Sequence, residues 1–207
     1  MFFDPFDPPK EIIEKAAQTI QSGGIVLHPS DTVYGLACNP FSQKALHRLL
    51  QIKGRPEGKG FLVIVHDLKM IKDLSDNFNE VFYELIDKLW PGPVTFLLNG
   101  KKTLSDAILG KKGQVGIRCP ALPFLNLWSR KISGPIISTS ANLSGKALPK
   151  SIKQLKCLFG EQVDLFLEGG EVNQRTKPST VIDLTTFPPC IVREGQKLKE
   201  IKEILEK

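Results

Sequence analysis

The sequence predicts an α/β protein built on a mixed β-sheet. Short apolar runs of strand character alternate with helical patterns in the first half of the chain, and strands dominate the second half. No internal repeat, low-complexity linker or change in composition divides the 207 residues. With 41% hydrophobic and 24% charged residues, the composition is that of a globular protein. We therefore expect one domain covering residues 1–207.

Helices are predicted where apolar residues recur every three to four positions. In the first helix, Asp7 is expected to be the N-cap before Pro8. Its apolar stripe runs to Ile20 and is stopped by Gly23 and Gly24. Further helices are expected from Ser42 onward and over about 77–89, 121–131, 151–159 and 198–207.

Strands are predicted at runs of apolar and β-branched residues bounded by turn residues. They are expected at 25–28, 61–65, 94–98, 115–119, 135–139, 164–168, 180–184 and 190–194. No charge-free apolar run approaches the ~18 residues of a membrane span, and the N-terminus is acidic where a signal peptide is basic. These features predict a cytoplasmic protein that does not enter a membrane.

Charge and cysteine content limit the classes of function. The net charge of +6 favours an anionic partner such as a nucleotide or RNA. The four cysteines form no CxxC pair and the three histidines lack the spacing of a metal motif. We therefore expect reduced, buried thiols and assign no metal site to the protein.

The stretch KGRPEGKGF, residues 53–61, places three cations and three glycines between a helical pattern and a strand. It is either a solvated turn or a site for a polyanion. The spacing differs from that of a P-loop, and no GxGxxG follows a strand. The chain also lacks a GxSxG elbow and an HExxH motif. A phosphate here would have to bind to cations and backbone N–H groups.

Polar clusters follow several of the predicted strands. One of them, PSDTVYG, follows the strand at 25–28, and another, STSANLSG, follows the strand at about 135. Polar loops at strand ends are where α/β proteins build small-molecule sites, although each cluster alone is also typical of a plain turn.

Seven segments together resemble the YrdC/TsaC family of threonylcarbamoyl-AMP synthases. They are, in order, PSDTVYGL, KGRPEGKGF, WPGPVTFLL, VGIRCP, ISTSANLSG, STVIDLT and IVREG, and they span roughly residues 10–195. The resemblance implies a twisted mixed sheet, parallel and antiparallel, flanked by helices, with a basic concave face. It also implies synthesis of L-threonylcarbamoyladenylate and pyrophosphate from L-threonine, bicarbonate and ATP, with Mg²⁺ expected. The product would pass to a transferase complex that modifies tRNA to threonylcarbamoyladenosine, so that any contact with tRNA is indirect.

The resemblance also implies roles for individual residues. Lys53 and Arg55 would face the ATP phosphates and act as the electrostatic catalytic groups. The expected ATP-binding residues are Arg55, Lys59, Gln114, Ser140, Asn142 and Arg193. The expected threonine-binding residues are Thr32, Arg118, Ser138 and Ser179, with Arg118 on the carboxylate. No histidine or carboxylate is assigned as a general base.

The chain departs from the family pattern at three points. Ile64 stands where many relatives have a histidine, and His66 would share its face of the strand. Leu148 replaces a small hydroxyl residue, which leaves only a backbone contact to ATP there. The chain also resembles the short form of the family, without an additional C-terminal domain.

Two other functions compete with the synthase. A non-catalytic protein that binds double-stranded RNA or tRNA would explain the positive charge. Serine and threonine residues at several strand ends are unnecessary for such binding and favour a small-molecule pocket. A carbamoyl-transferring enzyme related to hydrogenase maturation would share the fold, but its accessory modules are not in this sequence.

Overall fold

The computed structural model describes residues 1–207 except 56–57, 59, 77, 79, 172–176 and 206–207. In the described part, the strands are β1 (Val26–His28), β2 (Gly35–Cys38), β3 (Leu62–Ile64), β4 (Val94–Asn99), β5 (Gln114–Arg118), β6 (Ile136–Ser140), β7 (Leu165–Phe166), β8 (Thr180–Asp183) and β9 (Cys190–Arg193). The helices are α1 (Lys10–Gln21), α2 (Gln43–Lys53), α3 (Leu68–Ile71), α4 (Glu80–Leu89), α5 (Pro123–Ile132), α6 (Ile152–Phe159) and α7 (Leu198–Leu205).

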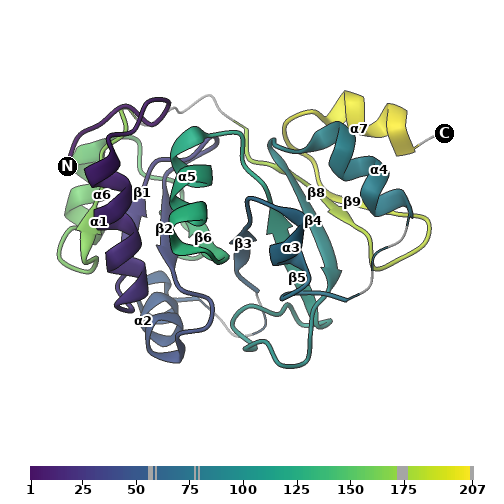
Figure 1. Ribbon diagram of the computed structural model, residues 1–207, viewed down its shortest axis with the longest axis horizontal. Helices are drawn as coiled ribbons and strands as arrows, with labels where there is room; N and C mark the ends of the chain where they lie inside the picture. Colours follow the sequence, from purple (N-terminus) through teal and green to yellow (C-terminus); the bar gives the residue numbers. More distant parts are fainter. Residues whose placement is uncertain (56–57, 59, 77, 79, 172–176, 206–207) are drawn as a thin grey trace.

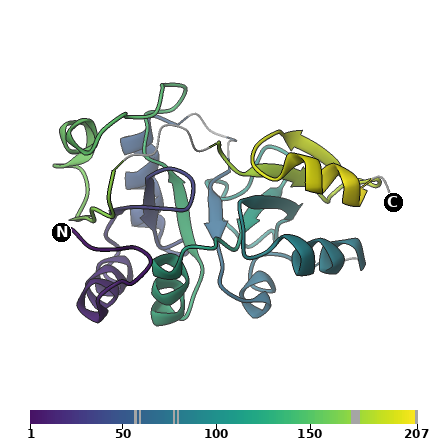
Figure 2. The same cartoon turned by 90° about the horizontal axis from the view of Figure 1, so that it is seen from above.

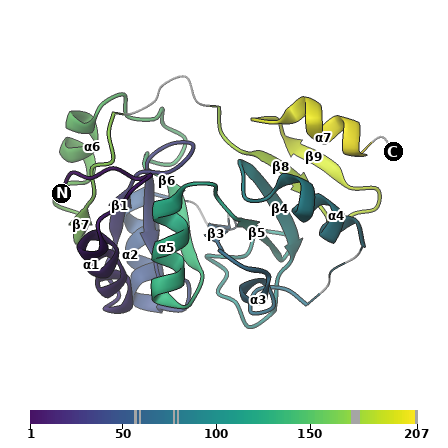
Figure 3. The same cartoon turned by 45° about the horizontal axis from the view of Figure 1, so that its top comes forward.

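The strands form one sheet in the order β7-β1-β2-β6-β3-β5-β4-β8-β9. Three neighbouring pairs are parallel, namely β1 with β7, β3 with β5, and β4 with β8. The other five pairs are antiparallel. The predicted mixed sheet flanked by helices is therefore confirmed. Strand β9 lies at one edge, and α7 and α4 lie near this end of the molecule (Figures 1 and 3).

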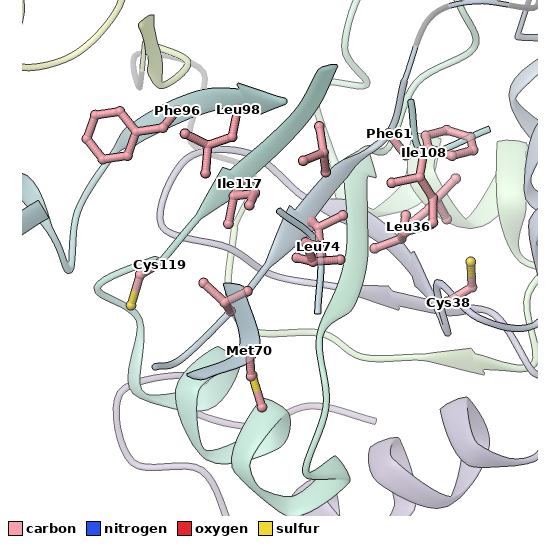
Figure 4. Packing of buried hydrophobic residues seen from close by; sticks show 14 of the residues in the cluster. Leu36, Cys38, Phe61, Met70, Leu74, Phe96, Leu98, Ile108, Ile117 and Cys119 are labelled. Carbon is pink, nitrogen blue, oxygen red and sulfur yellow. The ribbon is translucent and has the colours of Figure 1, made fainter. Parts of the chain in front are cut away.

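Two apolar clusters hold the helices to the sheet. Helices α1 and α5 lie side by side against the strands β1, β2 and β6, seen at the left of Figure 1 and from above in Figure 2. Their contacts to the sheet include Ala37, Ile64 and Ile136. The larger cluster joins α2 and α4 to alternate residues of the strands, such as Leu36, Phe96 and Ile117 (Figure 4). Burial of this apolar surface is the main stabilising term of the fold.

One expectation about local structure is wrong, and two elements were not predicted. Helix α1 begins at Lys10 after Pro9, which has no side-chain cap, so Asp7 is not the N-cap. The strand β2 and the short helix α3 were not predicted. The stop of α1 is confirmed, because Gly23 has a φ of 80°, a conformation that residues with a Cβ rarely adopt.

Two expectations concern the cysteines and membrane spans. None of the four cysteines is in a disulfide, and Cys38 and Cys119 are buried as expected. Cys157 and Cys190 are exposed, contrary to expectation. Within the described residues, no helix is long and apolar enough to span a membrane.

Candidate functional site

A cavity of about 620 Å³ opens beside the strands in the middle of the sheet. Eight of the predicted site residues line it, namely Thr32, Arg55, Gln114, Arg118, Ser138, Ser140, Ser179 and Arg193. Lys53 and Asn142 lie next to it without lining it, and Lys59 lies outside the described residues. The lining residues that were not predicted include the polar side chains of Thr95, Lys111, Lys112 and Asp183. A volume of this size is typical of small-molecule sites.

Strand β5 lines the cavity along the axis of the strand. Gln114, Gly116 and Arg118 line the cavity, whereas Val115 and Ile117 between them belong to the core. This is the alternation of a strand, and it places Gln114 and Arg118 about 13 Å apart along the sheet. Gly116 lies midway and has no side chain to fill the space between them.

Arg118 forms the buried end of this axis. Its Nη2 donates to Oδ1 of Asp31 over 2.7 Å, and its Nη1 lies 3.4 Å from the hydroxyl of Thr32. Burial lowers the pKa of Arg118, and the Asp31 carboxylate partly offsets this, so the guanidinium remains charged. A planar cation with hydroxyl groups beside it suits a ligand carboxylate.

Ser179 is held in place at the same end by Arg193. The guanidinium of Arg193 donates from Nη2 to both the carbonyl and the hydroxyl oxygen of Ser179, each over 2.9 Å. The Ser179 hydroxyl also lies 2.9 Å from Oγ1 of Thr95. Arg193 therefore lines the cavity but already uses two of its nitrogens on Ser179.

Cations gather where the loop after α2 meets the turn before β5. Arg55 packs its guanidinium 4.6 Å above the ring of Phe61 and donates to the carbonyl of Gly60. The backbone N–H of Lys111 donates to the carbonyl of Gly58 over 3.0 Å, so the two loops are joined. Lys111 and Lys112 are exposed at the cavity. No motif of the sequence analysis includes this lysine pair, although Lys112 stands only two residues before Gln114.

Lys53 has a different environment from the one expected. Its side chain is only 2% exposed. Its Nζ donates to the carbonyls of Ser140 and Asn142 and, over 3.2 Å, to Oδ1 of Asn142. Burial, with a smaller contribution from Arg55, lowers the pKa of Lys53 to about 8. In this structure the ammonium holds the turn after β6, and its contact with phosphate stays a prediction.

At the other end of β5, Gln114 belongs to a directed hydrogen-bond network. Its Nε2 donates to Oδ2 of Asp183 over 2.8 Å and to the hydroxyl of Thr185 over 2.7 Å. Thr185 in turn donates its N–H and its hydroxyl to Oδ1 of Asp183. Burial alone would raise the pKa of Asp183, but these hydrogen bonds outweigh it and hold the pKa below its ordinary value. A carboxylate can only accept, so the amide of Gln114 has a fixed orientation.

The positions at which the chain departs from the family pattern lie away from the cavity wall. Ile64 is buried under α5. His66 lies beyond the end of β3, where its Nδ1 is 3.0 Å from the hydroxyl of Ser129, so it does not replace Ile64 at the site. Leu148 is exposed and does not line the cavity.

No group of three or more metal-binding side chains exists among the residues that the structure describes. Asp183, the carboxylate that lines the cavity, is committed to Gln114 and Thr185. The residues present therefore do not form a protein site for Mg²⁺, although Mg²⁺ commonly binds through substrate phosphates.

Similar proteins have been described. Residues 18–195 match the Sua5/YciO/YrdC family, which carries the description "Telomere recombination". The chain is 33% identical to the YciO protein of Escherichia coli (strain K12) over 94% of both chains. It is 34% identical to the threonylcarbamoyl-AMP synthase of Pseudomonas syringae pv. syringae (strain B728a), over 88% of this chain and 97% of the synthase.

A solved structure has the same fold over nearly the whole chain. It is that of Sua5 from P. abyssi complexed with L-threonine, and the match has a TM-score of 0.90 at 30% identity. The match covers 99% of this chain and 60% of the Sua5 chain. With the family match over residues 18–195, these likenesses establish that the chain belongs to the Sua5/YciO/YrdC family.

Proposed function

We propose that this protein is an L-threonylcarbamoyladenylate synthase, a nucleotidyltransferase that forms threonylcarbamoyl-AMP and pyrophosphate from L-threonine, bicarbonate and ATP. The named synthase among its relatives and the threonine complex of Sua5 support this proposal. The observation that carries it is the polarity of the cavity along β5, from buried Arg118 at one end to Gln114 and the loop cations at the other.

The buried end fits an amino acid. Arg118 would pair with the carboxylate of threonine, and the hydroxyl groups of Thr32, Ser138 and Ser179 would surround the rest of the molecule. All four of these side chains are buried and line the cavity. A site that hydrogen-bonds a substrate hydroxyl rejects analogues without it, because its own polar groups would remain unpaired.

The cationic end fits a nucleotide. Arg55 would contact the phosphates, with Lys111 and Lys112 at the entrance, while Gln114 would lie near the base and Ser140 on the ATP side. Lys53 and Asn142 would act on ATP through the turn after β6, which their mutual hydrogen bonds hold. We keep Lys59 and Arg193 as further ATP-binding residues. Mg²⁺ would arrive with the triphosphate, and the basic concave face also remains an expectation.

The chemistry requires positioning and charge stabilisation. A carbamate oxygen of N-carboxythreonine would form a bond to the α-phosphorus of ATP, while the bond to the β-phosphate oxygen breaks and pyrophosphate leaves. Threonine as its free amine and bicarbonate would first condense to this carbamate with release of water. Because the carbamate is an anion, its attack on the α-phosphorus needs no general base. Cations placed in advance around the phosphates stabilise the charge that moves onto pyrophosphate.

The product would pass to a tRNA-modifying transferase complex in the cytoplasm, and contact of this protein with tRNA would be indirect. A protein that only binds RNA would have no use for a cavity lined by buried hydroxyl groups and Arg118.

The test is pyrophosphate release from ATP with L-threonine and bicarbonate supplied or withheld. We expect turnover only when both are present, because together they form the nucleophile. Equal turnover without threonine would refute the proposal, and RNA binding without any turnover would favour the non-catalytic alternative.

A further inference from the structure

His28 is a titratable side chain that no step of the proposed reaction uses, yet it is completely buried beside the cavity. It is the last residue of β1, and its ring packs 5.3 Å from that of Trp128 on α5, with Phe124 at 6.4 Å. Its two ring nitrogens have separate partners. Nδ1 lies 2.8 Å from the carbonyl oxygen of Pro29, and Nε2 lies 3.1 Å from the hydroxyl oxygen of Ser138.

These two contacts determine which nitrogen carries the proton. The carbonyl of Pro29 can only accept, so Nδ1 must be the donor. In the neutral ring Nε2 is then an acceptor, and the hydroxyl of Ser138 must donate its proton to it. Burial lowers the pKa of His28 to about 4, with Arg118 contributing in the same direction and the Pro29 carbonyl opposing it. The ring is therefore neutral at the pH of a cell.

The hydrogen bond between His28 and Ser138 depends on a glycine in β2, the strand between β1 and β6. Strand β2 runs between β1 and β6, and its Gly35 is the register partner of His28. A Cβ at Gly35 would lie 2.8 Å from Nε2 of His28 and 2.9 Å from Oγ of Ser138, closer than such contacts allow. Because this Cβ is missing, the imidazole reaches across β2 to a side chain on β6.

We propose that His28 is a positioning residue that makes Ser138 a pure hydrogen-bond acceptor in the cavity, so that the site selects a ligand presenting an N–H or O–H donor there. Ser138 lines the cavity, and its single proton is committed to Nε2. Its two lone pairs remain, so that toward a ligand Ser138 can only accept. Arg118, in the same cavity, is a pure donor.

A donor-only group and an acceptor-only group in one cavity match an amino acid zwitterion. Its carboxylate accepts from Arg118, and its ammonium or side-chain hydroxyl donates to Ser138. This inference rests on the proposed function and deepens it, because it explains how an uncharged hydroxyl discriminates between the two ends of the substrate. Without His28, the Ser138 proton would be free to turn toward the cavity and oppose the ligand's donor.

The binding test uses His28→Phe, Ser138→Ala and the double variant. Phenylalanine keeps a ring against Trp128 and removes the acceptor. We expect each single variant to raise the Kd of L-threonine about tenfold in calorimetric titration. The double variant should be no weaker than Ser138→Ala, because His28 acts through Ser138. The Kd of ATP should not change in any of them.

His66→Phe is the matched control, because His66 makes a similar bond to the hydroxyl of Ser129 outside the cavity. It should leave threonine binding unchanged. An unchanged threonine Kd in His28→Phe, or a loss that adds to that of Ser138→Ala, would overturn the inference while leaving the synthase intact. Failure of the wild type to bind threonine or to turn over ATP would instead remove the proposed function, and this inference with it.

A second measurement needs no change at His28. Nitrogen NMR of histidine-labelled protein reports the tautomer directly. We expect a neutral ring with the proton on Nδ1 in the wild type, and a shift of the Nε2 resonance in Ser138→Ala when its donor is lost. A proton on Nε2 in the wild type would refute the proposed direction of the hydrogen bond.

Discussion

Arg118, which lines the cavity, forms a 2.7 Å ion pair with Asp31, and each retains one buried polar atom without a hydrogen-bond partner, Nε of Arg118 and Oδ2 of Asp31. Asp31 neutralises the guanidinium, which makes its burial tolerable. Breaking such a pair from one side typically costs 3–5 kcal/mol, because the other charge stays buried. An Arg118→Ala variant would therefore lose stability as well as binding, and the two effects could not be separated.

Arg118→Lys separates the two effects. Lysine keeps a positive charge for Asp31 but loses the fork that bonds two oxygens at once. We expect the KM for threonine to rise about 10- to 100-fold, since one hydrogen bond to a charged group contributes about 1.5–3 kcal/mol. The KM for ATP should change little. Steady-state pyrophosphate release at varied threonine and varied ATP measures both, and an unchanged threonine KM would mean that Arg118 does not bind the carboxylate.

Lys53 and Arg55 should respond differently to substitution, although the family resemblance implies that both face the phosphates. Lys53→Met removes the donor to three oxygens of Ser140 and Asn142 while keeping the apolar stem. We expect Tm to fall by roughly 2–10 °C, because the carbonyl of Asn142 loses its donor at a cost of about 1–3 kcal/mol, whereas the Ser140 carbonyl and Oδ1 of Asn142 keep the Asn142 N–H and the Ser140 hydroxyl. Arg55→Ala should instead lower kcat/KM by about 10²–10³ with a smaller change in Tm.

Thermal melting and pyrophosphate release on both variants test this contrast. Lys102→Met, a change of an exposed lysine outside the cavity, controls for the loss of one charge. A Lys53→Met protein with wild-type Tm and no turnover would show that Lys53 acts on the phosphates directly. Near-wild-type activity of Arg55→Ala would remove Arg55 from the reaction.

The elements predicted well are those whose signal is local. The apolar stripe of α1 and the mostly apolar run of β4 are complete within their own segments. Strand β2 was missed because Gly35–Cys38 is short and lacks β-branched residues, and it becomes a strand through pairing with β1 and β6. Eight of the eleven predicted site residues line the cavity, but their hydrogen-bond partners come from distant segments. Asp183 lies 69 residues from Gln114 and Ser140 lies 87 from Lys53, and no local pattern predicts such contacts.

The Gln114 network predicts a preference for adenine. With Nε2 bound to Asp183 and Thr185, Gln114 offers a ligand its carbonyl oxygen. Adenine presents an amino donor where guanine presents a carbonyl acceptor. We expect Asp183→Asn to let the amide turn and to lower the ratio of kcat/KM for ATP over GTP by about tenfold, the size expected for one misdirected hydrogen bond.

Thr186→Val is the matched control for that change, because Thr186 is exposed and bonds outside the network. It should leave the ratio of ATP to GTP use unchanged. A ratio in Asp183→Asn equal to that of the wild type would show that Gln114 does not read the base.

The buried His28 predicts how stability changes in acid. Its pKa is lowered to about 4 in the folded protein and is about 6.5 in an unfolded chain. Between these values the unfolded chain binds the proton and the folded protein does not, so the free energy of unfolding falls as the pH falls through this window. From pH 7 to pH 5, this one group should cost the wild type about 2 kcal/mol.

His28→Phe isolates that contribution, because the carboxylates that also titrate in acid are present in both proteins. Urea unfolding of the wild type and the variant at pH 7, 6 and 5 should give curves that converge as the pH falls, with the wild type losing more stability. His47→Gln, a change of an exposed histidine on α2, should retain the wild-type slope. Parallel curves for the wild type and His28→Phe would mean that burial does not keep His28 neutral, and Ser138 would then have no fixed acceptor for its proton.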